Sequence, residues 1–82
     1  MAWVSSVDAR VRELTGGQAR FEVPAATVRG LLSALEARWP GLGAHVEADM
    51  ALAIDGEIHH DALGEPLSAD AEVVLIPRIG GG

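Results

Sequence analysis

The chain has 82 residues, 49% of them apolar and none of them cysteine, which allows one small globular domain and excludes disulfides, thiolate metal sites and a cysteine nucleophile. Its formal net charge of −6 argues against nucleic acid and anionic membranes as partners, because basic residues must contact the phosphates of both. No apolar run approaches the ~20 residues that span a bilayer, and the first residues lack a signal-peptide layout, so we expect a cytoplasmic protein.

The first quarter of the chain predicts an antiparallel pair of strands. Residues Trp3 to Val11 roughly alternate between apolar and polar side chains, which predicts a first strand. The paired glycines of Leu14-Thr15-Gly16-Gly17 supply the positive φ angles that a hairpin connection needs. Gln18 to Val23 alternates cleanly and is stopped by Pro24, which is typical of a half-buried antiparallel strand.

The next segment predicts the main helix. Thr27 is a suitable N-cap residue, and Pro40-Gly41 ends the helix. Between them, large apolar side chains recur at helical spacing and form one stripe, which indicates a face packed on the core. The stripe consists of Val28, Leu31, Leu32, Leu35 and Trp39.

The segment from Leu42 to Asp49 is predicted to be a polar connection with about one helical turn, anchored by Leu42 and Val46. Met50 to Ile54 predicts a third strand. Asp55-Gly56 is a favourable turn pair that leads into a very short return strand at Glu57-Ile58.

The sequence His59-His60-Asp61 raises the question of a metal site. Neighbouring side chains on an extended segment point to opposite sides, and the remaining histidine, His45, is distant in sequence. A solvated loop therefore explains these residues better than a ligand set, and we predict no metal site.

The order of the elements favours an α+β protein with a β-grasp (ubiquitin-like) fold. We expect a mixed sheet of four to five strands with one main helix on one face, and with the last strand beside the first. Residues 1–77 are predicted to form this single domain, and residues 78–82 a flexible C-terminal tail that ends in Gly81-Gly82.

The last strand, Val73 to Pro77, is apolar on both faces, because Val73 and Leu75 point one way and Val74 and Ile76 the other. One helix can cover only one face of a sheet. The second face is therefore either an interaction surface or is covered by loops or by Trp3.

Several motifs resemble the MoaD/ThiS sulfur-carrier family, and the similarity runs from about Val4 to Gly82. The strongest is an apolar strand, a proline and a terminal Gly-Gly. The motifs are Leu14-Thr15-Gly16-Gly17, Ala26-Thr27-Val28 with Leu31-Leu32, Glu72-Val73, and Ile76-Pro77 followed by Gly81-Gly82. Arg78 departs from the family pattern, where a second proline is common, and Gly80 adds a third glycine.

The resemblance implies a β-grasp protein that acts as a co-substrate and is not itself an enzyme. In that family an adenylating enzyme uses ATP to convert the C-terminal carboxylate, here that of Gly82, to an acyl-adenylate. A sulfur donor then converts it to a thiocarboxylate. The chain itself binds no cofactor. Gly81 and Gly82 would carry the chemistry, and the partner-binding residues would be Val74, Ile76, Pro77, Arg78, Ile79 and Gly80.

The resemblance leaves the recipient of the sulfur open. Molybdopterin synthesis is the first expectation, with the chain as the small subunit of a synthase-like sulfurtransferase and a large subunit as the acceptor. Thiamin and cysteine synthesis are the alternatives. A ubiquitin-like protein modifier, or a non-covalent binding module whose tail is idle, would also fit these motifs.

Overall fold

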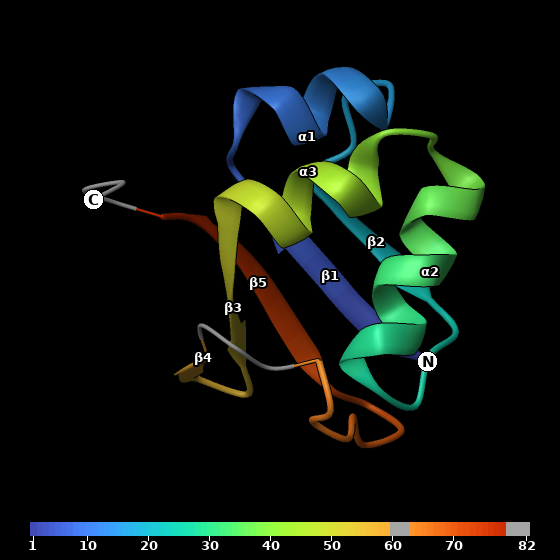
Figure 1. Ribbon diagram of the computed structural model, residues 1–82, viewed down its shortest axis with the longest axis vertical. Helices are drawn as coiled ribbons and strands as arrows, with labels where there is room; N and C mark the ends of the chain where they lie inside the picture. Colours follow the sequence, from blue (N-terminus) through green and yellow to red (C-terminus); the bar gives the residue numbers. More distant parts are fainter. Residues whose placement is uncertain (60–62, 79–82) are drawn as a thin grey trace.

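The computed structural model describes residues 1–59 and 63–78, and within them five strands form one mixed sheet in the order β2-β1-β5-β3-β4, accompanied by three helices (Figure 1). The elements are β1 Ala2–Ser6, α1 Ala9–Leu14, β2 Arg20–Val23, α2 Val28–Arg38, α3 Leu42–Asp49, β3 Met50–Ile54, β4 Glu57–His59 and β5 Glu72–Pro77.

The two ends of the chain meet in the middle of the sheet. β1 and β5 pair in parallel, with Val4 beside Val73, while β1 pairs with β2 and β3 pairs with both β5 and β4 in antiparallel fashion. A first hairpin, a helical crossover and a last strand beside the first define the β-grasp fold. The predicted fold class is therefore confirmed.

The first strand is shorter than predicted, because β1 ends at Ser6 and the chain then forms α1. The Asp8 carboxylate accepts a hydrogen bond from the backbone N–H of Val11 at 3.1 Å, which caps the helix. The Ser6 hydroxyl accepts one from the backbone N–H of Asp8 at 3.0 Å. The prediction of a strand through Val11 was wrong because a good N-cap followed by helix-forming residues outweighed a weak alternation.

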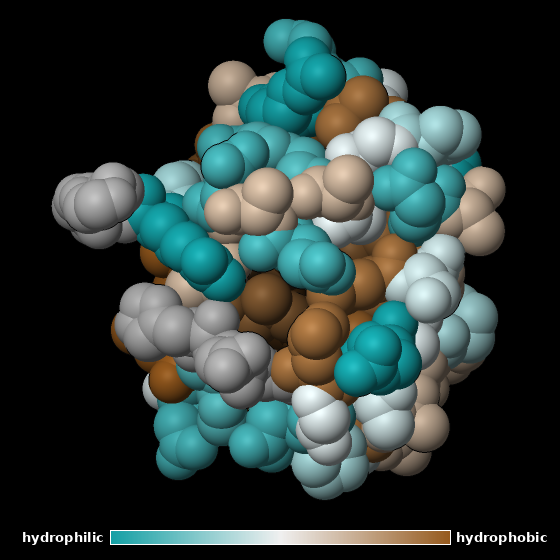
Figure 2. All heavy atoms as spheres, viewed as in Figure 1, coloured by the Kyte–Doolittle hydropathy of each residue, from teal (hydrophilic) through white to brown (hydrophobic). Residues whose placement is uncertain are grey.

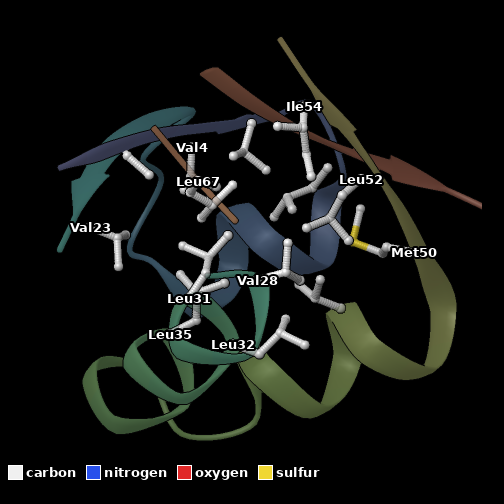
Figure 3. Packing of buried hydrophobic residues seen from close by; sticks show 14 of the residues in the cluster. Val4, Val23, Val28, Leu31, Leu32, Leu35, Met50, Leu52, Ile54 and Leu67 are labelled. Atoms are coloured by element: carbon white, nitrogen blue, oxygen red, sulfur yellow. The ribbon is translucent and has the colours of Figure 1, made fainter. Parts of the chain in front are cut away.

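The core lies between the sheet and α2, as predicted from the apolar stripe. Figure 3 shows side chains from the strands and from α2 pointing toward one another. Thr27 caps α2 by accepting a hydrogen bond from Gly30 N–H at 3.0 Å. Four residues of the stripe are buried, and Trp39 packs edge-on against Phe21 with ring centroids 4.7 Å apart.

α3 replaces the single helical turn that the sequence predicts. Leu42 and Val46 are buried, as expected of its anchors, but the helix continues to Asp49. Its N-cap, Gly41, has no side chain, and Glu36 of α2 takes that role by accepting hydrogen bonds from the backbone N–H groups of Gly41 at 2.7 Å and of residue 44 at 3.1 Å. These bonds lower the pKa of the Glu36 carboxyl.

Gly43 allows α2 and α3 to approach closely. A Cβ atom placed on this residue would lie 2.6 Å from the backbone oxygen of Leu32 and 2.9 Å from Cβ of Glu36.

Within residues 1–59 and 63–78, no helix is long and apolar enough to cross a membrane.

Gly43→Ala is expected to lower the free energy of unfolding by about 1–3 kcal/mol, because the added methyl group has no room against the backbone of α2. This reverses the usual gain for replacing glycine by alanine in a helix. Gly64→Ala is the control, since a Cβ there meets nothing within 4 Å, and it should stay within about 0.5 kcal/mol of the parent chain. Urea unfolding measures both, and equal values would contradict the close contact.

Candidate functional site: an apolar sheet face and the end of the last strand

β5 divides its apolar side chains between the two faces of the sheet. Val73 and Leu75 are 0% and 1% exposed and belong to the core, whereas Val74 on the opposite face is 41% exposed. Ile76 is half-buried on that same face. The expectation that the helices leave one apolar face of this strand uncovered is therefore confirmed.

The neighbouring strands extend this apolar area. Ala51 lies opposite Ile76, and Ala53 lies opposite Val74 on one side and Ile58 on the other. Both alanines are almost buried although they face away from the helices, because larger side chains stand beside them. Ile58 is 58% exposed. We name these five residues, Ala51, Ala53, Ile58, Val74 and Ile76, the outer patch.

A shallow hollow of about 230 Å³ continues the outer patch toward the other side of β5. Its lining includes Val7, Ala19 and Pro77 together with Val74 and Ile76. Val7 follows the end of β1 and is fully accessible to a partner, with 88% of its surface exposed. Aliphatic side chains around a hollow are suited to receive an apolar side chain of another protein.

The opposite end of the same face is polar. Arg20 lies over the ring of Trp3, 4.0 Å from its centroid, and makes an ion pair with Glu72 at 2.8 Å. Trp3 thus covers neither the core nor the outer patch. Along β5 the side chains on this outer face change from charged at Glu72 to apolar at Val74 and Ile76, so the apolar part adjoins the C-terminal end of the strand.

The end of β5 is attached to the junction between α3 and β3, which meet at this edge in Figure 1. The backbone N–H of Arg78 donates to the Asp49 carbonyl oxygen at 3.0 Å. The Arg78 Nε donates to the Met50 carbonyl oxygen at 3.1 Å. Arg78, the first residue of the expected tail, is thus held in place. The other predicted site residues, Ile79, Gly80, Gly81 and Gly82, lie outside the described residues.

The helix-covered side differs from the outer patch. Figure 2 shows mostly hydrophilic and intermediate side chains there, with a hydrophobic area beside α2. Across residues 1–59 and 63–78, no group of three histidine, cysteine or acidic side chains could hold a metal ion. His59 contacts Glu57 at 3.3 Å and Glu65 at 3.8 Å, while His60 and Asp61 lie outside the described residues.

Sequence reasoning found part of this face and missed part of it. Val74 and Ile76 were identified from alternation alone, but the contributions of Ala51, Ala53 and Ile58 depend on the register between strands. A cluster of Asp8, His45 and Asp49 beside the end of β5 was also missed. The spacing of His45 and Asp49 would have indicated one of its contacts if the segment had been assigned as a helix.

The comparison with protein families shows which family the chain belongs to. A model of the ThiS family matches residues 7–82. The chain belongs to the ThiS family. The resemblance to sulfur carriers that the motifs indicated is therefore confirmed, and no curated protein matches the chain.

Solved structures of the same fold are similar over nearly the whole length. A chain of the BexX/CysO complex of Amycolatopsis orientalis has a TM-score of 0.83 at 21% identity, with 100% of both chains covered. CysO of Mycobacterium tuberculosis has a TM-score of 0.84 at 19% identity, covering 96% of this chain and 100% of its own. Small archaeal modifier protein 1 of Methanosarcina acetivorans has 0.77 at 21% identity, covering 99% and 95%. At these identities the likeness establishes the fold.

Val73→Ala and Val74→Ala are expected to differ in stability although they are neighbours on one strand. Val73→Ala should cost about 2–3 kcal/mol, since it leaves a cavity in the core. Val74→Ala should cost less than about 1 kcal/mol, because its side chain is already partly in water. Chemical unfolding of both variants measures the difference, and a cost at Val74 equal to that at Val73 would show that the outer face is covered.

Proposed function

We propose that this protein is a cytoplasmic sulfur carrier whose Gly82 carboxylate is the reactive group. A partner enzyme adenylates this carboxylate, and a sulfur donor then converts it to a thiocarboxylate. The chain supplies the acyl group and the surface by which the partners recognise it. The partners supply ATP binding, sulfur and acid–base catalysis.

The proposed chemistry is a pair of acyl and phosphoryl transfers. The Gly82 carboxylate oxygen attacks the α-phosphorus of ATP, and pyrophosphate leaves. Sulfur at the oxidation level of sulfide, delivered by the donor, then attacks the acyl carbon to form the C–S bond, and AMP departs as the C–O bond breaks. The adenylate is needed because a carboxylate is a poor electrophile and its adenylate a good one. Glycine suits such a terminus, since a residue without Cβ fits a narrow channel and leaves the acyl carbon accessible.

The observation that carries the proposal is the continuity between the outer patch and the end of β5. Val74 and Ile76 lead directly to Pro77 and to Arg78, which is hydrogen-bonded to the domain. A partner that covers the apolar face is thereby positioned to receive the residues that follow. Pro77 adds stiffness at this point, which reduces the entropy lost on docking.

The acceptor of the sulfur is the finer part of the proposal. Molybdopterin synthesis, expected from the motifs, would require a large synthase subunit to cover the outer patch. Membership of the ThiS family supports thiamin synthesis equally. The likeness to CysO structures supports the third alternative, cysteine synthesis. The proposal therefore specifies the carrier chemistry and leaves all three acceptors to be distinguished by which synthase consumes the thiocarboxylate.

Incubation of the chain ending at Gly82 with its adenylating enzyme, ATP and a sulfur donor is expected to exchange one C-terminal oxygen for sulfur. Intact-mass spectrometry detects the exchange. Deletion of Gly82, or addition of one alanine after it, should abolish it, because the acyl group is then misplaced in the partner. Both variants should keep the urea midpoint of the parent chain. If the truncated chain still supports the cellular function, a non-covalent binding module replaces the carrier proposal.

Val74→Asp is expected to weaken binding to the adenylating enzyme at least tenfold, about 1.4 kcal/mol, because an unpaired carboxylate would be buried in an apolar interface. Ala37→Asp is the matched control, since it adds the same charge at an exposed position of α2 on the other side of the molecule. Titration calorimetry compares the two. Equal weakening by both variants would show that net charge, and not the outer patch, determines binding.

A second function, covalent modification of other proteins, is favoured by the likeness to small archaeal modifier protein 1. The same adenylate serves both functions, with a lysine amine of a target as the nucleophile in place of sulfur. All six basic residues of this chain are arginine, so another copy of the chain offers no lysine for attachment. Single adducts on target proteins, detected by mass spectrometry, would establish this function.

A further inference from the structure

The side chain of His45 is held between two carboxylates at the end of β5. Its Nε2 lies 3.1 Å from Oδ2 of Asp8, the N-cap residue of α1. Its Nδ1 lies 3.2 Å from Oδ2 of Asp49, the last residue of α3. The His45 and Asp8 side chains are each only 20% exposed, so water competes weakly for the contact between them. The Asp49 side chain is 67% exposed, so water competes more strongly for its contact with His45.

This cluster is connected to the segment that the proposed function makes reactive. Asp49 contacts His45 with its carboxylate and accepts the backbone N–H of Arg78 with its carbonyl oxygen. His45 and Arg78, which both contact Asp49, line one hollow of about 500 Å³. Its lining also includes Asp8, Asp49 and Pro77. A change in how His45 holds Asp49 therefore acts on the residue to which Arg78 is bonded.

Each ring nitrogen of His45 has a carboxylate as its neighbour. An imidazole donates a hydrogen bond from one ring nitrogen and an imidazolium from both, so the ring can link the two carboxylates. Among the described residues lining the hollow, the charged side chains are Asp8 and Asp49, which contact His45, and Arg78.

Asp8 responds to the same arrangement. Burial by itself raises the pKa of the Asp8 carboxyl, but the hydrogen bonds from His45 and from the Val11 backbone, with the charge of His45, lower it overall. Asp8 is thus a carboxylate at neutral pH and offers His45 a charged acceptor.

We propose that His45 is a positioning residue that, by bridging Asp8 and Asp49, fixes Asp49 and thereby the direction in which the chain leaves the sheet at Arg78. This inference rests on the proposed function in one respect: the direction of the chain at Arg78 matters because it presents the following residues to the adenylating enzyme. Loss of the His45 side chain breaks both contacts and loosens the attachment of Arg78. Docking then weakens, while the chemical step at Gly82 is unaffected.

Hydrogen exchange of the Arg78 backbone amide tests the attachment without any partner. Protection measured at one pH and corrected for intrinsic exchange should be about fivefold lower in His45→Gln than in the parent chain, because both contacts of the imidazole are lost. Asp49→Asn should also lower it, since a neutral amide accepts a weaker hydrogen bond than a carboxylate does.

Glu47→Gln is the matched control for Asp49→Asn. It removes the same charge from an exposed position of the same helix without touching His45, and it should behave as the parent chain does. Protection at Arg78 that is the same in the parent chain, His45→Gln and Asp49→Asn would overturn the inference. If His45→Gln fails to fold, the comparison of Asp49→Asn with Glu47→Gln decides.

The kinetics of adenylation give a second readout. His45→Gln should raise KM for the carrier about fivefold and leave kcat within about twofold, because preorganisation affects docking and not the reacting atoms. An unchanged KM, with the amide result as expected, would limit the role of His45 to the free protein and overturn the positioning role. Failure of the parent chain to be adenylated would instead refute the proposed function.

Discussion

The structure depends on the parallel pairing of β1 with β5, which places the last strand of the chain in the middle of the sheet. A central strand is hydrogen-bonded along both edges, here to β1 and to β3. The segment that follows it therefore starts from one of the best-supported points of the sheet. A C-terminal extension on an edge strand would start from a backbone bonded on one side only.

The central place of β5 also explains the outer patch. Its core-facing side chains meet α2, and its other side chains form the middle of a face that no helix covers. On the β3 side of this face the side chains of Ala51 and Ala53 are small, so those of Val74 and Ile76 project beyond them. The Trp3–Arg20–Glu72 contacts confine the apolar area to the half of the face nearest the end of the strand.

The helices depend on side chains from other elements at their ends. Glu36 of α2 supplies the hydrogen bonds that the glycine N-cap of α3 lacks, and His45 connects the N-cap of α1 to the last residue of α3. These contacts join α1, α2, α3 and the end of β5 into one framework. Packing of the apolar core fixes where the helices lie, and the polar contacts fix how their ends are oriented.

By itself, the sequence determined the features that arise from local periodicity and chain order. The helical stripe of α2, its Thr27 cap, the alternation in β5 and the turn at Asp55-Gly56 all follow from spacing within a few residues, and the order of elements was enough for the β-grasp fold. Several motifs along the chain, the terminal one strongest among them, were enough for the resemblance to the family. The helix at Ala9–Leu14 also has a local cause, the Asp8 N-cap, which the weak alternation obscured. Only the tertiary structure decided that Ala51, Ala53 and Ile58 share a face with Val74. It also brought Asp8 to His45 across 37 positions of sequence. Contacts of this kind depend on register and on helix packing, and no local pattern records them, because the energy that selects them comes from the whole core.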